Sequence, residues 1–199
     1  MKSSTKLNSL ALALALAIPL AAQAESNVST GAGALTTTAR VDFSVVIPKI
    51  LFLRVGSAGA GIDSIVFTVP SGSVGNATPI AGTGGDLTNG VVTAVVQANS
   101  GTVTLNATAT GALSDGAGDS INYTQIVTTA ATNTTATVLA APVLANGTSG
   151  NVTLTPVSKI VNQDAKWTYT YSNSAVVPAG TYGGVNTNNS RVTYTATMP

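Results

Sequence analysis

Apolar and polar residues alternate along much of the chain after residue 38. The clearest example has an apolar row formed by Val41, Phe43, Val45 and Ile47, while Arg40, Asp42, Ser44 and Val46 occupy the other face. A period of two residues is typical of a β-strand with two different faces. We therefore expect a strand over residues 39–47 that ends at Pro48, because proline has no N–H to donate to a ladder.

The same alternation, bounded by Gly, Pro, Asn, Asp and Ser, predicts further strands. These are expected over residues 50–55, 65–69, 91–98, 102–108, 121–127, 152–155, 165–171 and 192–198. The run 50–55 is almost continuously apolar, which suggests burial on both faces. Residues 71–89 are expected to form a loop, and residues 128–141 fit a strand or a loop equally well.

The segment Asn99-Ser100-Gly101 separates two of these predicted strands by a short turn with a glycine. Such a turn favours a β-hairpin of 91–98 with 102–108. Together, the eight or nine strands and the spread of Gly and β-branched residues favour an all-β fold over a helical one. We expect a single antiparallel β-sandwich over residues 39–199.

The first 24 residues have the pattern of a secretory signal peptide. Lys2 and Lys6 precede the short apolar run 10–20, and Ala22-Gln23-Ala24 fits a cleavage site. Residues 25–38, which follow, are small and polar, and we expect them to form a flexible N-terminal segment. After cleavage the chain is expected to have no integral membrane segment. We expect export beyond the inner membrane, to the cell surface, the periplasm or the exterior.

The charge balance limits the possible partners and chemistry. Without Lys2 and Lys6 the chain has six basic residues against seven acidic ones, which argues against nucleic acid as a partner. There is no His and no Cys, so the usual nucleophile–base pairs and transition-metal ligands are missing. The expectation is a non-enzymatic protein with no catalytic residues, no metal site and no cofactor.

Two other features have both a functional and a structural interpretation. The loop 114–120 contains Asp115 and Asp119, which suggests Ca²⁺ ligands, but a plain connecting loop is favoured because further carboxylates are missing. Trp167, Tyr169 and Tyr171 lie on one face of a predicted strand. They would suit a sugar-binding platform if exposed, but core packing is the favoured interpretation.

The segment 39–47 is the main functional candidate. Polar residues precede it and Pro48 separates it from the rest, as expected of a strand that pairs with a neighbouring subunit. In such β-strand addition the main chain supplies hydrogen bonds and alternate apolar side chains fill pockets. The candidate donor residues are Val41, Phe43, Val45 and Ile47. The alternative, that 39–47 is the first strand of a self-complete sandwich, has at least equal weight.

Both ends of the mature chain resemble a known family. Val41–Ser57 (VDFSVVIPKILFLRVGS), Ala179–Gly184 (AGTYGG) and Val192–Ala196 (VTYTA) are similar to alpha-type chaperone–usher pilins of colonisation-factor fimbriae. Together they cover about a fifth of the chain, and the absence of Cys also fits this branch. The resemblance implies an incomplete immunoglobulin-like sandwich completed by donor-strand exchange. It also implies a homo-oligomer, a periplasmic chaperone and a location at the surface of a Gram-negative bacterium. The function expected is thus a pilus-type structural subunit; the alternative is a self-contained exported module that binds a glycan or surface protein.

Overall fold

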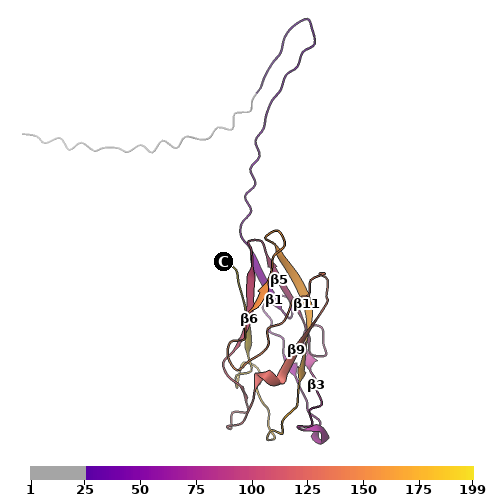
Figure 1. The fold of residues 1–199 in the computed structure, drawn as a ribbon, viewed down its shortest axis with the longest axis vertical. Coiled ribbons are helices and arrows are strands. Elements are labelled where there is room, and N and C mark those ends of the chain that lie inside the picture. Colours follow the sequence, from indigo (N-terminus) through magenta and orange to yellow (C-terminus); the bar gives the residue numbers. More distant parts are fainter. Residues whose placement is uncertain (1–25) are drawn as a thin grey trace, which may run out of the picture. The chain divides into compact units, whose positions relative to one another are not determined.

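The computed structural model describes residues 26–199. The predicted signal peptide, residues 1–24, lies outside the described residues. The chain divides into two units, Met1–Ile47 and Pro48–Pro199, and each is described by itself. The second unit contains all the described strands and is all-β, as expected (Figure 1).

The larger sheet has five antiparallel strands. β5 and β11 lie at its centre, β1 pairs with β5 at one edge, and β9 pairs with β11 at the other. The short β3 pairs with the end of β11, on the β5 side. The bounds are β1 Leu51–Val55, β3 Ile80–Ala81, β5 Val91–Ala98, β9 Ile126–Ala131 and β11 Val161–Tyr171.

The smaller sheet has three antiparallel strands in the order β10-β6-β12. Their bounds are β10 Val152–Leu154, β6 Val103–Ala109 and β12 Val192–Thr197. β6 lies in the middle, so β12 and β10 are the edges. All three strands alternate between a more buried and a more exposed face, as expected when one face of an antiparallel sheet covers a core.

The remaining elements are short. Two small ladders join β2 (Ile65–Val66) to β4 (Thr83–Gly84) and β7 (Leu113–Ser114) to β8 (Ser120–Ile121). Two single-turn 3-10 helices are η1 (Ser71–Ser73) and η2 (Tyr123–Gln125). Within residues 26–199 no helix has the length and apolar character needed to cross a bilayer.

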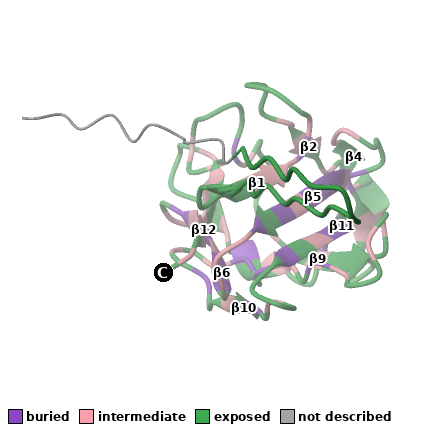
Figure 2. Cartoon of the chain, turned by 90° about the horizontal axis from the view of Figure 1, so that it is seen from above, coloured by how far each residue is buried: buried purple, intermediate pink, exposed green. Residues whose placement is uncertain are grey.

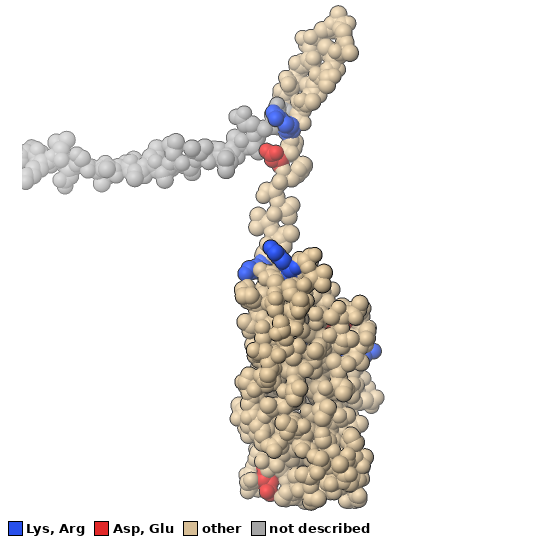
Figure 3. Space-filling view, in the orientation of Figure 1, with Lys and Arg blue, Asp and Glu red and all other residues tan. Residues whose placement is uncertain are grey.

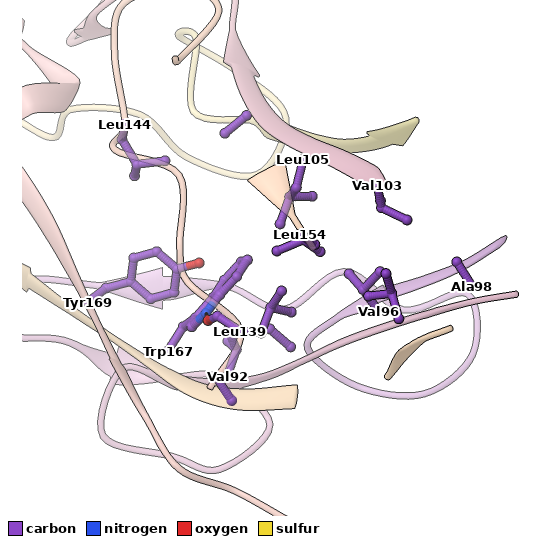
Figure 4. Packing of buried hydrophobic residues seen from close by; sticks show 14 of the residues in the cluster. Val92, Val96, Ala98, Val103, Leu105, Leu139, Leu144, Leu154, Trp167 and Tyr169 are labelled. Carbon is purple, nitrogen blue, oxygen red and sulfur yellow. Dashed lines mark hydrogen bonds between the residues drawn. The ribbon is translucent and has the colours of Figure 1, made fainter. Parts of the chain in front are cut away.

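One hydrophobic core joins the inner faces of both sheets (Figure 4). Trp167 and Val96 of the larger sheet and Leu105 of the smaller sheet are all fully buried. The indole N–H of Trp167 donates to the carbonyl of Leu139 at 2.8 Å, so its one polar group is satisfied inside the core. A core shared by two sheets is consistent with the expected β-sandwich; its immunoglobulin-like character stays a prediction.

The structure corrects the predicted hairpin around residues 99–101. β5 and β6 follow each other in the chain, but β5 belongs to the larger sheet and β6 to the smaller one. The turn therefore carries the chain from one layer to the other. Alternation only requires that each strand bury one face, and this holds whether neighbours pair in one sheet or face each other across a core.

The expectation that 50–55 is buried on both faces was also wrong. Leu51 is 39% exposed and Phe52 is 46% exposed, because β1 is an edge strand with a neighbour on one side only. The predicted loop 71–89 contains the short strands β3 and β4. Of the undecided stretch 128–141, the first four residues extend β9 and the remainder forms no regular strand.

Residues 26–47 form no strand or helix and are exposed throughout (Figure 2). Within this part the hydroxyl of Thr37 donates to the carbonyl of Asn27 at 2.7 Å. The strand expected over 39–47 is therefore not formed in this chain. A single extended segment has no ladder partner for its backbone, so alternation alone does not make it a strand.

Candidate functional site

The two lateral sides of the β-sheet domain differ in how they are closed. On the side of β9 and β10, the segment 132–151 covers the gap between the sheets. Leu139 and Leu144 of this segment are buried in the core. This side of the core is thus completed by the chain itself.

Backbone contacts attach the covering segment to both sheets. The N–H of Leu139 donates to the carbonyl of Asp164 in β11 at 3.1 Å. At the smaller sheet, the N–H of Ala107 in β6 donates to the hydroxyl of Ser149 at 2.9 Å. The segment therefore provides hydrogen-bond partners for backbone groups at the edges of both sheets, which would otherwise be exposed to solvent.

The carboxylate of Asp164 anchors the beginning of this segment. Asp164 is 4% exposed and accepts hydrogen bonds from the N–H and hydroxyl groups of both Thr134 and Thr135, and from the Asn133 amide at 2.8 Å. Burial alone would raise the pKa of this carboxyl, but the hydrogen bonds from Thr134 and Thr135 outweigh burial and hold the pKa well below its usual range. The group is a buried anion satisfied by donors, which is a structural role.

On the opposite side, β1 and β12 are both edge strands. Among the described strands, β1 pairs only with β5 and β12 pairs only with β6. Some of their Cα atoms approach within 8 Å, so the two edges face each other across the end of the core. Within residues 48–199 no further strand pairs with their outer edges.

The inward-facing side chains at this side are only partly buried, in contrast to the fully buried residues of β5 and β6. They are apolar, and we call them the groove residues: Leu51, Leu53, Val55, Val192, Tyr194, Ala196 and Met198. All of them except Leu51 pack against the core. A separate hollow of about 370 Å³ beside β1 is lined by Phe52–Val55 and the loop residues Ser57, Ala58, Gly59 and Gly61, with no residue of β12 in its lining. Partly exposed apolar surface of this kind often marks an interaction site.

The two edges carry little protection against pairing with another strand. Natural edge strands are commonly protected by charged residues or proline. β12 (VTYTAT) has neither, and β1 (LFLRV) has only Arg54, whose Nε is buried without a hydrogen-bond partner. Charged side chains are also sparse on the face shown in Figure 3.

The predicted donor residues are exposed. Val41, Phe43, Val45 and Ile47 have between 71% and 90% of their surface accessible, and Val46 on the other face is 89% exposed. The groove residues, by contrast, were not singled out by the sequence. The uncharged alternation of residues 192–198 was visible, but whether a strand is central or at an edge depends on long-range pairing.

The other two sequence candidates are structural. Trp167, Tyr169 and Tyr171 are all at most 6% exposed, so core packing is confirmed and they offer no sugar platform. In the loop 114–120, Oδ1 of Asp115 accepts N–H bonds from Ala117, Gly118 and Asp119 at 2.8–3.1 Å. The bond from Ala117 is the largest reason that the pKa of Asp115 lies below its usual range. Among residues 26–199 no group of three or more potential metal-ligating side chains occurs.

No family model, curated protein or solved structure matches the chain. The functional evidence in this molecule is therefore its own geometry: an open, apolar side of the domain and an exposed alternating segment.

Proposed function

We propose that this protein is a structural subunit that assembles with copies of itself by β-strand addition. In this proposal, residues 41–47 of one copy occupy the open side between β1 and β12 of another. The proposal includes no catalytic step and no cofactor. A pilus-type filament at the surface of a Gram-negative bacterium is the assembly that fits it.

The open side of the domain is the observation that carries the proposal. The core is closed by the covering segment 132–151 at one side, whereas at the other side Leu51 is 39% exposed and the other groove residues are only partly buried. Burying apolar surface contributes about 25 cal/mol per Å², so an apolar strand in this position would be favoured.

The exposed segment has suitable dimensions and chemistry. Seven residues in extended conformation span about 23 Å, and the six residues of β12 span about 20 Å. Alternate side chains of a strand point to one face. The apolar row that contains Phe43 and Val45 would therefore contact the groove residues, while Asp42 and Ser44 would face solvent. The main chain would supply the N–H and C=O groups that β1 and β12 lack on their outer edges.

Insertion between both edges requires a small movement. Neighbouring strands lie about 4.8 Å apart, so a strand paired on both sides separates its neighbours by about 10 Å. Some Cα pairs of β1 and β12 now lie within 8 Å. Addition would therefore move these parts of the two edges apart by at least about 2 Å.

Export and chaperoning belong to the same proposal. Removal of residues 1–24 would leave residues 41–47, which we call the donor segment, near the new N-terminus. A periplasmic chaperone that fills the open side would keep the groove from premature pairing until another copy replaces it. The alternative, a self-contained binding module, lacks a corresponding site in Trp167, Tyr169 and Tyr171 because these residues are buried.

The test compares two substitutions in the mature full-length protein. Phe43→Asp places a charge in the row that fills the groove, whereas Val46→Asp makes the same kind of change on the opposite face. Phe43 and Val46 are 90% and 89% exposed, so neither substitution removes a buried contact from the isolated chain.

We expect wild type and Val46→Asp to form multimers that survive SDS without heating. Phe43→Asp should remain monomeric with an unchanged circular dichroism spectrum, and so should a chain lacking residues 25–47. A wild-type mature protein that is strictly monomeric and stable would contradict the proposal. Equal loss of multimers in both Asp variants would show that the pattern of the segment is irrelevant.

A further inference from the structure

The side chain of Asn99 holds the residues that connect the donor segment to β1. Asn99 follows β5 at the start of the turn to β6. Its Nδ2 donates to the carbonyl oxygen of Pro48 at 2.8 Å, and its Oδ1 accepts from the N–H of Ile50 at 2.9 Å. Between these two residues, Nζ of Lys49 donates to the backbone oxygen of Pro199 at 3.1 Å.

The two hydrogen bonds of Asn99 resemble one more residue pair in the ladder between β1 and β5. The paired register of β1 with β5 ends at Leu51 opposite Ala98. A side-chain amide offers one donor and one acceptor, like a backbone peptide group. By binding the C=O of Pro48 and the N–H of Ile50, Asn99 extends the pairing beyond Ala98 and keeps residues 48–50 in line with β1.

This straight connection affects which groove the donor segment can reach. Only three residues, 48–50, separate Ile47 from β1. Three residues are enough for a hairpin loop, so chain length alone does not prevent residues 41–47 from turning back onto β1 of their own domain. Such a turn would place Val45 opposite Leu53, and it would break both bonds to Asn99.

We propose that Asn99 is a positioning residue that disfavours this closed form and thereby directs the donor segment to a second copy of the chain. The inference rests on the proposed function, because it assumes that residues 41–47 fill a groove between β1 and β12. Loss of two ordinary hydrogen bonds is expected to raise the ratio of closed monomer to multimer about tenfold.

Disulfide trapping in the full mature chain tests the inference, since the chain has no cysteine of its own. The pair Val45→Cys and Leu53→Cys is introduced into three backgrounds: wild type, Asn99→Ala and Gln97→Ala. Gln97 is the matched control, because its exposed amide donates to Asn162 of β11 at 3.3 Å rather than to residues 48–50. After mild oxidation, non-reducing SDS gels separate intrachain from interchain disulfides.

We expect an interchain ladder in the wild-type and Gln97→Ala backgrounds. Asn99→Ala should raise the amount of fast-migrating monomer with an intrachain disulfide, relative to the ladder, about tenfold. A ladder unchanged by Asn99→Ala would overturn the role of Asn99 while leaving strand addition intact. If neither kind of disulfide forms in any background, the proposed function itself fails.

Hydrogen exchange provides a measurement that does not depend on the folding of a variant. The amide of Ile50 should exchange slowly in the wild-type protein because it is bonded to Asn99. Exchange of Ile50 at the rate of the donor-segment amides would show that the connection is not held, and would overturn the inference.

Discussion

The hydroxyl groups of Tyr169 and Tyr194 lie 2.7 Å apart, and the hydrogen bond between them joins the two sheets. Tyr169 belongs to β11 in the larger sheet, whereas Tyr194 belongs to the edge strand β12. The ring of Tyr194 also packs against Trp167, with centroids 5.3 Å apart. This pair therefore attaches the edge of the proposed groove to the centre of the core.

The first prediction concerns the strength of this attachment. Tyr169→Phe and Tyr194→Phe each leave one buried hydroxyl without its partner, which should cost about 1–2 kcal/mol of unfolding free energy. The double variant should cost little more than either single one, because both partners are then removed. A double-mutant cycle from urea unfolding measures this coupling, and additive losses would show that the two hydroxyls act independently.

The second prediction concerns alkaline pH. Burial raises the pKa of Tyr194 to about 12, although its hydrogen bond with Tyr169 lowers it slightly, and burial also raises the pKa of Tyr169. A raised pKa means that the folded state holds the phenol proton more tightly than the unfolded state does. The stability that these tyrosines contribute is therefore fully present below pH 10, the pKa of tyrosine in the unfolded chain. It should be lost as pH rises from about 10 to 12.

Urea midpoints between pH 8 and 12 measure this loss. The double Phe variant should lose less stability over that range than wild type. Tyr123, whose pKa is also raised to about 12 by burial, should account for part of what remains.

The third prediction concerns the buried anion that anchors the covering segment. Asp164→Asn places an amide N–H₂ group among donors from Thr134 and Thr135 and should cost about 3 kcal/mol. Because the folded pKa of Asp164 is depressed, its stabilising effect is present above the unfolded value near 3.8. It is lost as pH falls below that value.

Chemical denaturation at pH 7 and pH 2.5 checks both parts of this prediction. The difference in unfolding free energy between wild type and Asp164→Asn should be large at pH 7 and smaller at pH 2.5. Asp119→Asn is the control, because Asp119 is exposed and its replacement should change stability by less than about 0.5 kcal/mol. A constant difference at both pH values would show that the charge of Asp164 is not the cause.

The fourth prediction concerns the end of β1. Gly56 has a φ of +91°, and a Cβ placed there would collide with the carboxylate of Asp63. That carboxylate accepts from the hydroxyl of Ser57 at 2.9 Å, so it is not free to move away. Gly56→Ala should therefore lower the unfolding free energy by about 2–4 kcal/mol, through backbone strain and lost loop contacts.

Gly101 provides the matched control for this substitution. Its φ is +114°, but no atom lies within 4 Å of a Cβ built on it. Gly101→Ala should show only the cost of the backbone conformation, about 1–2 kcal/mol. Equal losses at both positions in thermal unfolding would mean that the contact with Asp63 has no effect.

The sequence by itself determined the all-β class and most of the longer strands of this protein. Period-two alternation was sufficient to predict strands at β5, β6, β10, β11 and β12, because a strand that covers a core must place apolar side chains on one face. The same pattern also marked the apolar row that contains Phe43 and Val45, although the strand expected there is not formed in this chain. In both cases the information is local.

Only the tertiary structure decided which strands pair and which edges stay open. β5 and β6 were expected to form a hairpin but lie in different sheets. Residues 50–55 were expected to be buried on both faces, but β1 is a partly exposed edge strand. Pairing depends on residues far apart in the chain, such as Leu51 with Ala98, and alternation is the same for either arrangement. The edge positions of β1 and β12 follow from these long-range pairings, and so do the hydrogen bonds of Asn99 to Pro48 and Ile50.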